Sequence, residues 1–155
     1  SLDNDLQKQQ ILFSFHEVGI ENDRLSLEGF TLNPFEYLDV YNKIDISLDP
    51  FPFGGGTVSY ESLWMGVPIL TMLGASFMGR LCGSLMKQVG LSNWIVNSRS
   101  DYISLAISLS SNLAELDKIR RTLRQQAQLS IFDGAKYTRE FESALLKVWG
   151  DYIKN

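Results

Sequence analysis

The sequence predicts an α/β fold, a doubly wound parallel sheet followed by a helical C-terminal segment. Short apolar segments alternate with helical patterns of about ten residues or more, and strands that such crossovers join are parallel. From Ser100 onward the pattern is helical throughout. The 155 residues are 45% hydrophobic and 21% charged, which suits one globular domain with a core and excludes a disordered chain.

Capping residues and periodicity define the N-terminal elements. Asp3 or Asn4 can cap a first helix that runs through Val18 and ends at Gly19, because glycine accepts the left-handed conformation after a helix. A short strand is expected next, at residues 24–29. The apolar side of the first helix carries Leu6, Ile11, Leu12, Phe15 and Val18.

A second helix, a second strand and a glycine-rich loop follow. Pro34 stands at the first position of the helix, where its missing N–H costs nothing, and the helix runs to about Asn42. Residues 44–48 alternate apolar and polar side chains, which is typical of a strand. The loop at residues 49–56 then leads into a third helix.

Glycines and one proline delimit the remaining elements. Gly66 and Gly90 are each expected to end a helix, and Pro68 stands at the start of a strand, where proline is tolerated. The chain opens on a helix, whereas a complete nucleotide-binding lobe begins with a strand, so we expect a piece of a longer protein. The expected elements are a helix at 57–65, a strand at 67–72, a helix at 77–89, a strand at 94–96 and helices at 101–112, 114–129 and 135–153.

Composition and charge exclude several classes of function. The net charge of −4 gives no general attraction to nucleic acid or to anionic membranes, and no apolar run approaches the roughly 20 residues of a membrane span. Cys82 is the single cysteine and His16 the single histidine, so an internal disulfide and a multi-histidine or CxxC metal site are excluded. We therefore expect no metal cofactor and a reducing, cytoplasmic compartment.

Residues 45–68 carry the candidate chemistry, because they place a strand, three glycines and a helix N-terminus in succession. Glycines allow backbone N–H groups to turn toward one point, and the first turn of a helix adds free N–H groups and a positive dipole end. This pattern predicts a phosphate or pyrophosphate site, and Glu61 one turn later could accept hydrogen bonds from a ribose. The alternatives are a plain tight turn and a solvated Glu61.

The same stretch, DISLDPFPFGGGTVSYESLWMGVP at 45–68, resembles the C-terminal catalytic lobe of the peptide O-GlcNAc transferase family. The corresponding family pattern is D-I-x-L-D-x-F-P-Y-N-G-x-T-T-x-x-E/D-A-L-W-M-G-V-P-V. Members are two-lobed (GT-B) inverting glycosyltransferases that use UDP-sugars, and bacterial relatives follow tetratricopeptide (TPR) repeats. The likeness continues through Gly79 and Arg80 and covers nearly the whole chain.

The resemblance implies that residues 1–155 form one UDP-sugar-binding lobe, the Rossmann-like half of a GT-B fold. Its implied partners are a UDP-sugar, the missing N-terminal lobe and repeat domain of the parent chain, and a protein acceptor. No catalytic residue is implied in this chain. Among the departures, Val58 replaces the second threonine of the family pattern, Gly54 replaces its asparagine, and Tyr37 stands where some relatives have a histidine that faces the donor. The implied donor-binding residues are Gly55, Gly56, Thr57, Val58, Glu61 and Tyr37.

The resemblance therefore implies a lobe that binds the nucleotide sugar while N-acetylglucosamine moves from UDP to a protein Ser or Thr hydroxyl. Amides of the glycine turn would stabilise the charge on the departing UDP, and the isolated chain would be inactive. The alternative from another class is a non-catalytic interaction module with a decayed site, which Tyr37 and Val58 favour. A receiver-like domain would need an acidic pair with a matching lysine at the strand ends, which this sequence lacks.

Other charged and apolar residues have two interpretations. Asp49 is expected to fix the loop and Asp45 to stand at the start of the strand, rather than to form a metal or acid/base pair. The basic residues of 118–124 are expected on a solvated helix face, not in a binding patch. The apolar residues at helical spacing in 137–152 predict a core stripe or, in an isolated lobe, a partly exposed face that drives self-association.

Overall fold

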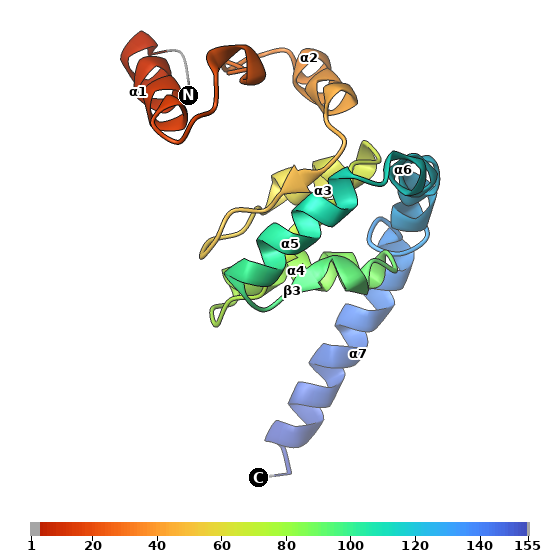
Figure 1. Ribbon diagram of the computed structural model, residues 1–155. Helices are drawn as coiled ribbons and strands as arrows, with labels where there is room; N and C mark the ends of the chain where they lie inside the picture. Colours follow the sequence, from red (N-terminus) through yellow and green to blue (C-terminus); the bar gives the residue numbers. More distant parts are fainter. Residues whose placement is uncertain (1–3, 155) are drawn as a thin grey trace. The chain divides into compact units, whose positions relative to one another are not determined.

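The computed structural model describes residues 4–154 and contains two compact units, which divide between Asp39 and Val40 (Figure 1). The first unit has two helices with a short 3-10 turn between them. In chain order these are α1 (Asp5–His16), η1 (Asn22–Arg24) and α2 (Pro34–Asp39).

The predicted first helix is confirmed, and Asn4 is its cap. The Asn4 side chain accepts a hydrogen bond of 2.9 Å from the Leu6 N–H, and Gly19 follows the helix with a φ of +80°. The alternative cap, Asp3, lies outside the described residues. No residue of α1 is buried, so the apolar side that the sequence predicts contributes to no core.

The strand expected at residues 24–29 is wrong. Arg24 ends the 3-10 turn, and the residues after it have no regular structure. A strand needs a neighbouring strand as its hydrogen-bond partner, and the described part of this unit provides none. Local polar contacts are made instead, such as the 3.2 Å hydrogen bond from the Ser26 hydroxyl to the Glu28 carboxylate.

The second unit is built on a three-stranded parallel sheet, which confirms the predicted α/β fold. The strands are β1 (Ser47–Leu48), β2 (Ile69–Met72) and β3 (Ile95–Val96), and they lie in that order. Each is shorter than the sequence pattern suggests, because only residues with a partner in the neighbouring strand form the ladder. In this register Leu48, the last residue of β1, pairs with Leu70.

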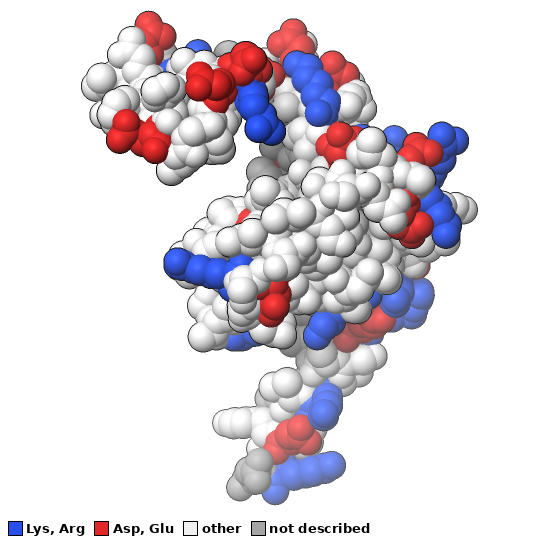
Figure 2. All heavy atoms as spheres, in the orientation of Figure 1, with Lys and Arg blue, Asp and Glu red and all other residues white. Residues whose placement is uncertain are grey.

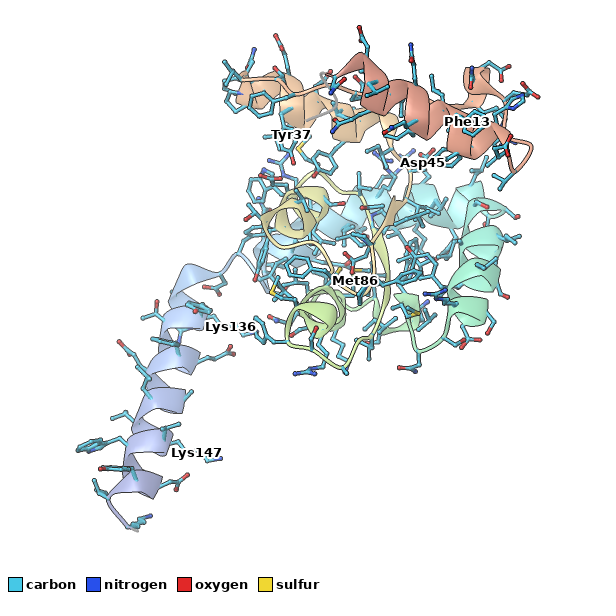
Figure 3. All side chains as sticks on the ribbon, turned by 90° about the vertical axis from the view of Figure 1, so that its left-hand side faces the viewer. Phe13, Tyr37, Asp45, Met86, Lys136 and Lys147 are labelled. Carbon is cyan, nitrogen blue, oxygen red and sulfur yellow. The ribbon has the colours of Figure 1, made fainter. Side chains whose placement is uncertain are left out.

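Helices cover both faces of this sheet, as a doubly wound fold requires. The helical elements are η2 (Val40–Lys43), α3 (Thr57–Trp64), α4 (Met78–Gln88), η3 (Ser92–Trp94), α5 (Arg99–Ser110), α6 (Leu113–Gln128) and α7 (Gly134–Tyr152). The helices α3 and α4, which connect successive strands, lie on one side of the strands, and α5 lies on the other (Figure 3). Gly66 and Gly90 end α3 and α4 with φ values of +77° and +79°, as predicted.

The core of the second unit lies between the sheet and its helices. Side chains from β2, α3, α4 and α6 pack with Trp94, which is fully buried. The largest fully buried apolar side chains are Trp94, Leu63, Ile69, Leu70, Met86, Leu123 and Val67.

The basic residues on α6 divide into two groups. Arg121 is exposed and pairs with an acidic residue of its own helix, so the predicted solvated face is confirmed for it, and Figure 2 shows acidic and basic side chains interleaved over α6. Arg120 instead donates to the backbone carbonyl of Ile44, and the Arg124 guanidinium lies 4.4 Å from the centre of the Trp64 ring. These two arginines connect α6 to the segment before β1 and to α3.

No residue of α7 is buried, so the core stripe expected for residues 137–152 is wrong and the alternative, an exposed face, is confirmed. Tyr137 is 66% exposed and Trp149 is 60% exposed. Each stacks on an aromatic neighbour of the same helix, Phe141 and Tyr152 respectively. Self-association through this face stays a prediction.

Candidate functional site

The glycine-rich loop, residues 49–56, lies at the carboxyl end of β1 and leads directly into α3. In open α/β sheets, ligands bind at the carboxyl ends of the strands. The register confirms this placement, because the Asp49 N–H continues the β1–β2 ladder with a 3.0 Å bond to the Leu70 carbonyl. The loop therefore begins at the last backbone hydrogen bond between β1 and β2.

Asp49 holds the loop from inside the protein. Its side chain accepts a 2.7 Å hydrogen bond at Oδ1 from the Gly55 N–H and another of 2.7 Å at Oδ2 from the Thr71 hydroxyl. Asp49 is only 6% exposed and Thr71 is fully buried. We name this arrangement of Asp49, Gly55 and Thr71 the Asp49 clasp. The prediction that Asp49 fixes the loop is confirmed.

Packing explains the first two of the three glycines. A Cβ on Gly54 would lie 2.9 Å from Asp49 Oδ2, and a Cβ on Gly55 would lie 2.5 Å from Ser59 Oγ, which is closer than real Cβ atoms approach. A Cβ on Gly56 would meet nothing within 4 Å. Gly54 and Gly55 are therefore required by close contacts within the protein, whereas Gly56 borders open space.

The N–H groups after the clasp are available to a ligand. The Gly55 N–H points to Asp49, but no hydrogen bond within residues 4–154 uses the N–H groups of Gly56, Thr57 and Val58. Gly56 is the N-cap of α3, and Thr57 and Val58 are exposed in its first turn. Three consecutive donors at a helix N-terminus form an anion-binding arrangement, which the helix dipole reinforces.

Tyr102 of α5 holds the loop from the other face of the sheet. Its hydroxyl donates a 3.1 Å hydrogen bond to the Asp49 backbone carbonyl, and its ring meets the Phe51 ring edge-on with the centroids 5.5 Å apart. Burial, and then the nearby Asp49 charge, raise the pKa of Tyr102 to about 12, so the hydroxyl remains a donor at neutral pH. The Arg99 guanidinium lies over the Phe51 ring, 5.4 Å from its centroid.

Cys82 lies beside the clasp and is not a nucleophile there. Burial, and then the Asp49 charge, raise the pKa of its thiol to about 12. A thiol with so high a pKa carries almost no thiolate at neutral pH. Cys82 is therefore a free, buried and inert cysteine.

Glu61 lies on α3, four residues after Thr57. Residues four apart share one face of a helix, so the Glu61 carboxylate and the first-turn residue Thr57 lie on the same side of α3. The residue is partly buried. The start of α3 is also held from outside, because the Tyr41 hydroxyl donates a 3.3 Å bond to the Val58 carbonyl.

Tyr37 belongs to the first unit, on α2, where Figure 3 labels it. It lines a hollow of about 400 Å³ together with Phe30, Leu32 and Pro34. The walls of this hollow are mainly apolar and aromatic, which suits a flat ring.

Two residues singled out in the sequence have structural partners elsewhere. The carboxylate of Asp45 pairs with Arg120 at 3.3 Å, on the surface and away from the clasp, so Asp45 and Asp49 form no shared acidic pair. The Arg80 guanidinium donates to the Ala75 carbonyl in the loop after β2. The first turn of α4 packs against the glycine-rich loop, because a Cβ on Gly79 would lie 3.2 Å from the Pro52 carbonyl oxygen.

Sequence reasoning missed Thr71 and Tyr102, which hold Asp49 from β2 and α5. Thr71 is the one polar residue of β2, and that isolated hydroxyl was the available signal. Tyr102 carried no signal, because a tyrosine in the first turns of a helix has many uses. The functional roles expected for Gly55, Gly56, Thr57, Val58, Glu61 and Tyr37 stay predictions.

The described residues form neither a metal-binding cluster nor a membrane-spanning helix. Among residues 4–154, no cluster of three or more His, Cys, Asp or Glu side chains is arranged to hold a metal ion. None of the helices in this range combines the length and apolar composition needed to cross a bilayer.

Comparisons with known proteins converge on one family. The model of glycosyl transferase family 41 matches residues 7–141. A probable UDP-N-acetylglucosamine–peptide N-acetylglucosaminyltransferase SPINDLY of Solanum lycopersicum is 37% identical over 149 residues, which are 96% of this chain and 16% of that protein. The protein of the same description from Petunia hybrida is 36% identical over 149 residues, again 96% of this chain and 16% of its own length.

A solved structure is also similar. It is that of a Thermobaculum terrenum O-GlcNAc transferase mutant, which is 32% identical, with a TM-score of 0.87, over 97% of this chain and 29% of that chain. The chain thus spans about one sixth of the length of the curated relatives above and less than a third of the solved structure.

Proposed function

Because the chain belongs to glycosyl transferase family 41, we propose that it is the nucleotide-sugar-binding lobe of an enzyme that glycosylates proteins. The proposed donor is UDP-N-acetylglucosamine, and the proposed acceptor is a Ser or Thr hydroxyl of a protein. The rest of the enzyme would comprise the N-terminal lobe, a TPR repeat domain and the residues that act as acid and base. The proposed compartment is the cytoplasm.

The observation that carries this proposal is the row of three unused N–H groups at Gly56, Thr57 and Val58. A diphosphate presents several acceptor oxygens with negative charge, and a helix N-terminus binds such groups without a lysine or a metal. Val58, the departure from the family pattern that lies within this row, removes a hydroxyl but keeps the N–H. The anion-binding arrangement therefore survives it.

Glu61 fits another part of the donor, the ribose. Glu61 lies one helical turn after the N–H groups that would bind the diphosphate. A carboxylate at this position can accept hydrogen bonds from two hydroxyl groups, as a ribose presents. The assignment of Glu61 rests on chemical fit and on the family pattern. Tyr37 belongs to the first unit, and its assignment to the donor comes from the family resemblance.

In the proposed reaction, the acceptor hydroxyl oxygen attacks the anomeric carbon of the sugar. The bond from that carbon to the β-phosphate oxygen breaks, and UDP leaves with the bonding electrons. Negative charge on the leaving diphosphate increases as the bond breaks, so the N–H groups of Gly56–Val58 bind it more strongly in the transition state than in the ground state. The proton of the hydroxyl passes to a base outside this chain.

Titration of the ¹⁵N-labelled chain with UDP tests the donor site. We expect amide shifts at Gly56, Thr57 and Val58 and smaller ones at Gly55, whose N–H is committed to Asp49. Uridine, which lacks both phosphates, is the matched control and should leave the chemical shifts of these amides unchanged. An unchanged spectrum up to about 10 mM UDP would contradict the proposal and favour the non-catalytic interaction module.

A further inference from the structure

Asp49 is a buried carboxylate that the proposed reaction does not use directly. It is the first residue after β1, is 6% exposed, and accepts two hydrogen bonds of 2.7 Å. Its two partners come from different parts of the unit, since Gly55 belongs to the loop and Thr71 to β2. The side chain therefore joins the loop to the middle strand of the sheet.

This linkage fixes the direction of the loop amides. A carboxylate with a short hydrogen bond at each oxygen, to groups held by separate elements, has little freedom to rotate. The Gly55 N–H is thereby fixed toward the interior, one residue before Gly56. Because successive planar peptide units share a Cα atom, the orientation of Gly55 restricts the orientation of the N–H groups that follow.

Other contacts keep Asp49 in this place. The Tyr102 hydroxyl donates to its backbone carbonyl, and a side chain larger than hydrogen at Gly54 would meet its Oδ2 at 2.9 Å. The clasp thus has a defined geometry, and neither Asp49 nor Thr71 is placed to touch a ligand, since both are buried.

We propose that Asp49 and Thr71 are positioning residues for the donor: through Gly55 they hold the glycine-rich loop so that the N–H groups of Gly56, Thr57 and Val58 face the diphosphate. This inference rests on the proposed function. It assigns to the clasp an effect on donor binding that is separate from its contribution to stability.

Two matched pairs of variants in the complete protein test it. Thr71→Val removes the hydroxyl with almost no change in volume, and Thr71→Ser keeps the hydroxyl. Asp49→Ala removes both acceptors, whereas Asp49→Asn keeps an acceptor for Gly55 and offers an N–H₂ group to the Thr71 hydroxyl. The measurements are the UDP dissociation constant by calorimetry, the KM for the UDP-sugar and for the acceptor peptide, and the thermal midpoint.

We expect Thr71→Val to raise the UDP dissociation constant and the donor KM by about tenfold, with the acceptor KM within about twofold of wild type. Thr71→Ser and Asp49→Asn should restore donor binding to within about threefold of wild type. Asp49→Ala should match or exceed the loss in Thr71→Val wherever it remains folded.

Three results would overturn the inference: a folded Thr71→Val protein with wild-type donor binding, a Thr71→Ser protein as impaired as Thr71→Val, or an equal rise in donor and acceptor KM. Each of these presupposes a wild-type protein that binds UDP. A wild-type protein that does not bind UDP would instead overturn the proposed function itself, so the two failures are distinguishable.

Discussion

Replacement of Gly54 by alanine tests how tightly the loop is packed around Asp49. The added methyl group would lie 2.9 Å from Asp49 Oδ2 and 3.3 Å from Oδ1. Asp49 cannot move aside freely, because both of its oxygens are held by hydrogen bonds of 2.7 Å. Gly54 does not have a positive φ, so the predicted effect comes from space and not from the backbone conformation.

The expected cost follows from these contacts. Overpacking of a filled interior costs about 1–3 kcal/mol, and rotation of Asp49 away from its partners would leave a buried polar group unsatisfied at a similar cost. We take about 2 kcal/mol as the expected loss in the free energy of unfolding. For a chain of this size, that corresponds to a decrease of about 4–8 °C in the thermal midpoint.

Urea unfolding followed by tryptophan fluorescence measures this cost, since Trp94 is fully buried. The control is Gly150→Ala on α7, where an added Cβ meets nothing within 4 Å. It should stabilise the helix by about 0.5–1 kcal/mol. A loss below about 0.5 kcal/mol for Gly54→Ala would refute the reasoning, because it would mean that Asp49 accommodates the methyl group without losing its partners.

The remaining predictions concern the core, the thiol and α7. Leu63→Ala should lower the free energy of unfolding by about 2–5 kcal/mol in urea, because Leu63 is fully buried, whereas Leu113→Ala at an exposed position should change it by less than about 0.5 kcal/mol. Burial and the Asp49 charge raise the pKa of Cys82 from 9.0 to about 12. The unfolded chain therefore loses this proton at a lower pH than the folded chain, and the free energy of unfolding should fall as pH rises from about 9 toward 12. Cys82→Ala should make this pH dependence weaker. An unchanged pH dependence would contradict the raised pKa of Cys82. Trp149→Gln should change the free energy of unfolding by less than about 0.5 kcal/mol, because the ring is 60% exposed, and a larger loss would indicate that α7 is covered.

Local signals in the sequence predicted most of the fold. Caps such as Asn4 and terminating glycines such as Gly66 and Gly90 act within one turn of the chain, so the helix limits could be deduced from neighbouring residues. The strand expected at 24–29 failed because a strand depends on a partner that local patterns do not specify. The predicted family was confirmed, since its pattern is a run of adjacent residues at 45–68.

The candidate site was only partly predictable, for the same physical reason. That Asp49 holds the loop could be inferred, because the loop follows it directly. Its second partner, Thr71, is 22 positions later in the chain and is brought beside Asp49 only by the register of β1 on β2. The three glycines also look equivalent in the sequence. In the structure they differ, because a Cβ on Gly54 or Gly55 would be too close to neighbouring atoms, whereas Gly56 borders open space.

The position of the glycine-rich loop depends on residues 49, 71 and 102, which belong to separate elements and meet only when β1, β2 and α5 have assembled. Competence to bind an anion therefore requires that these three elements have assembled, and a ligand of this loop would bind the folded chain in preference to partly folded ones. Such a ligand would act as a reporter of correct assembly, and its saturating addition would raise the melting temperature of the chain.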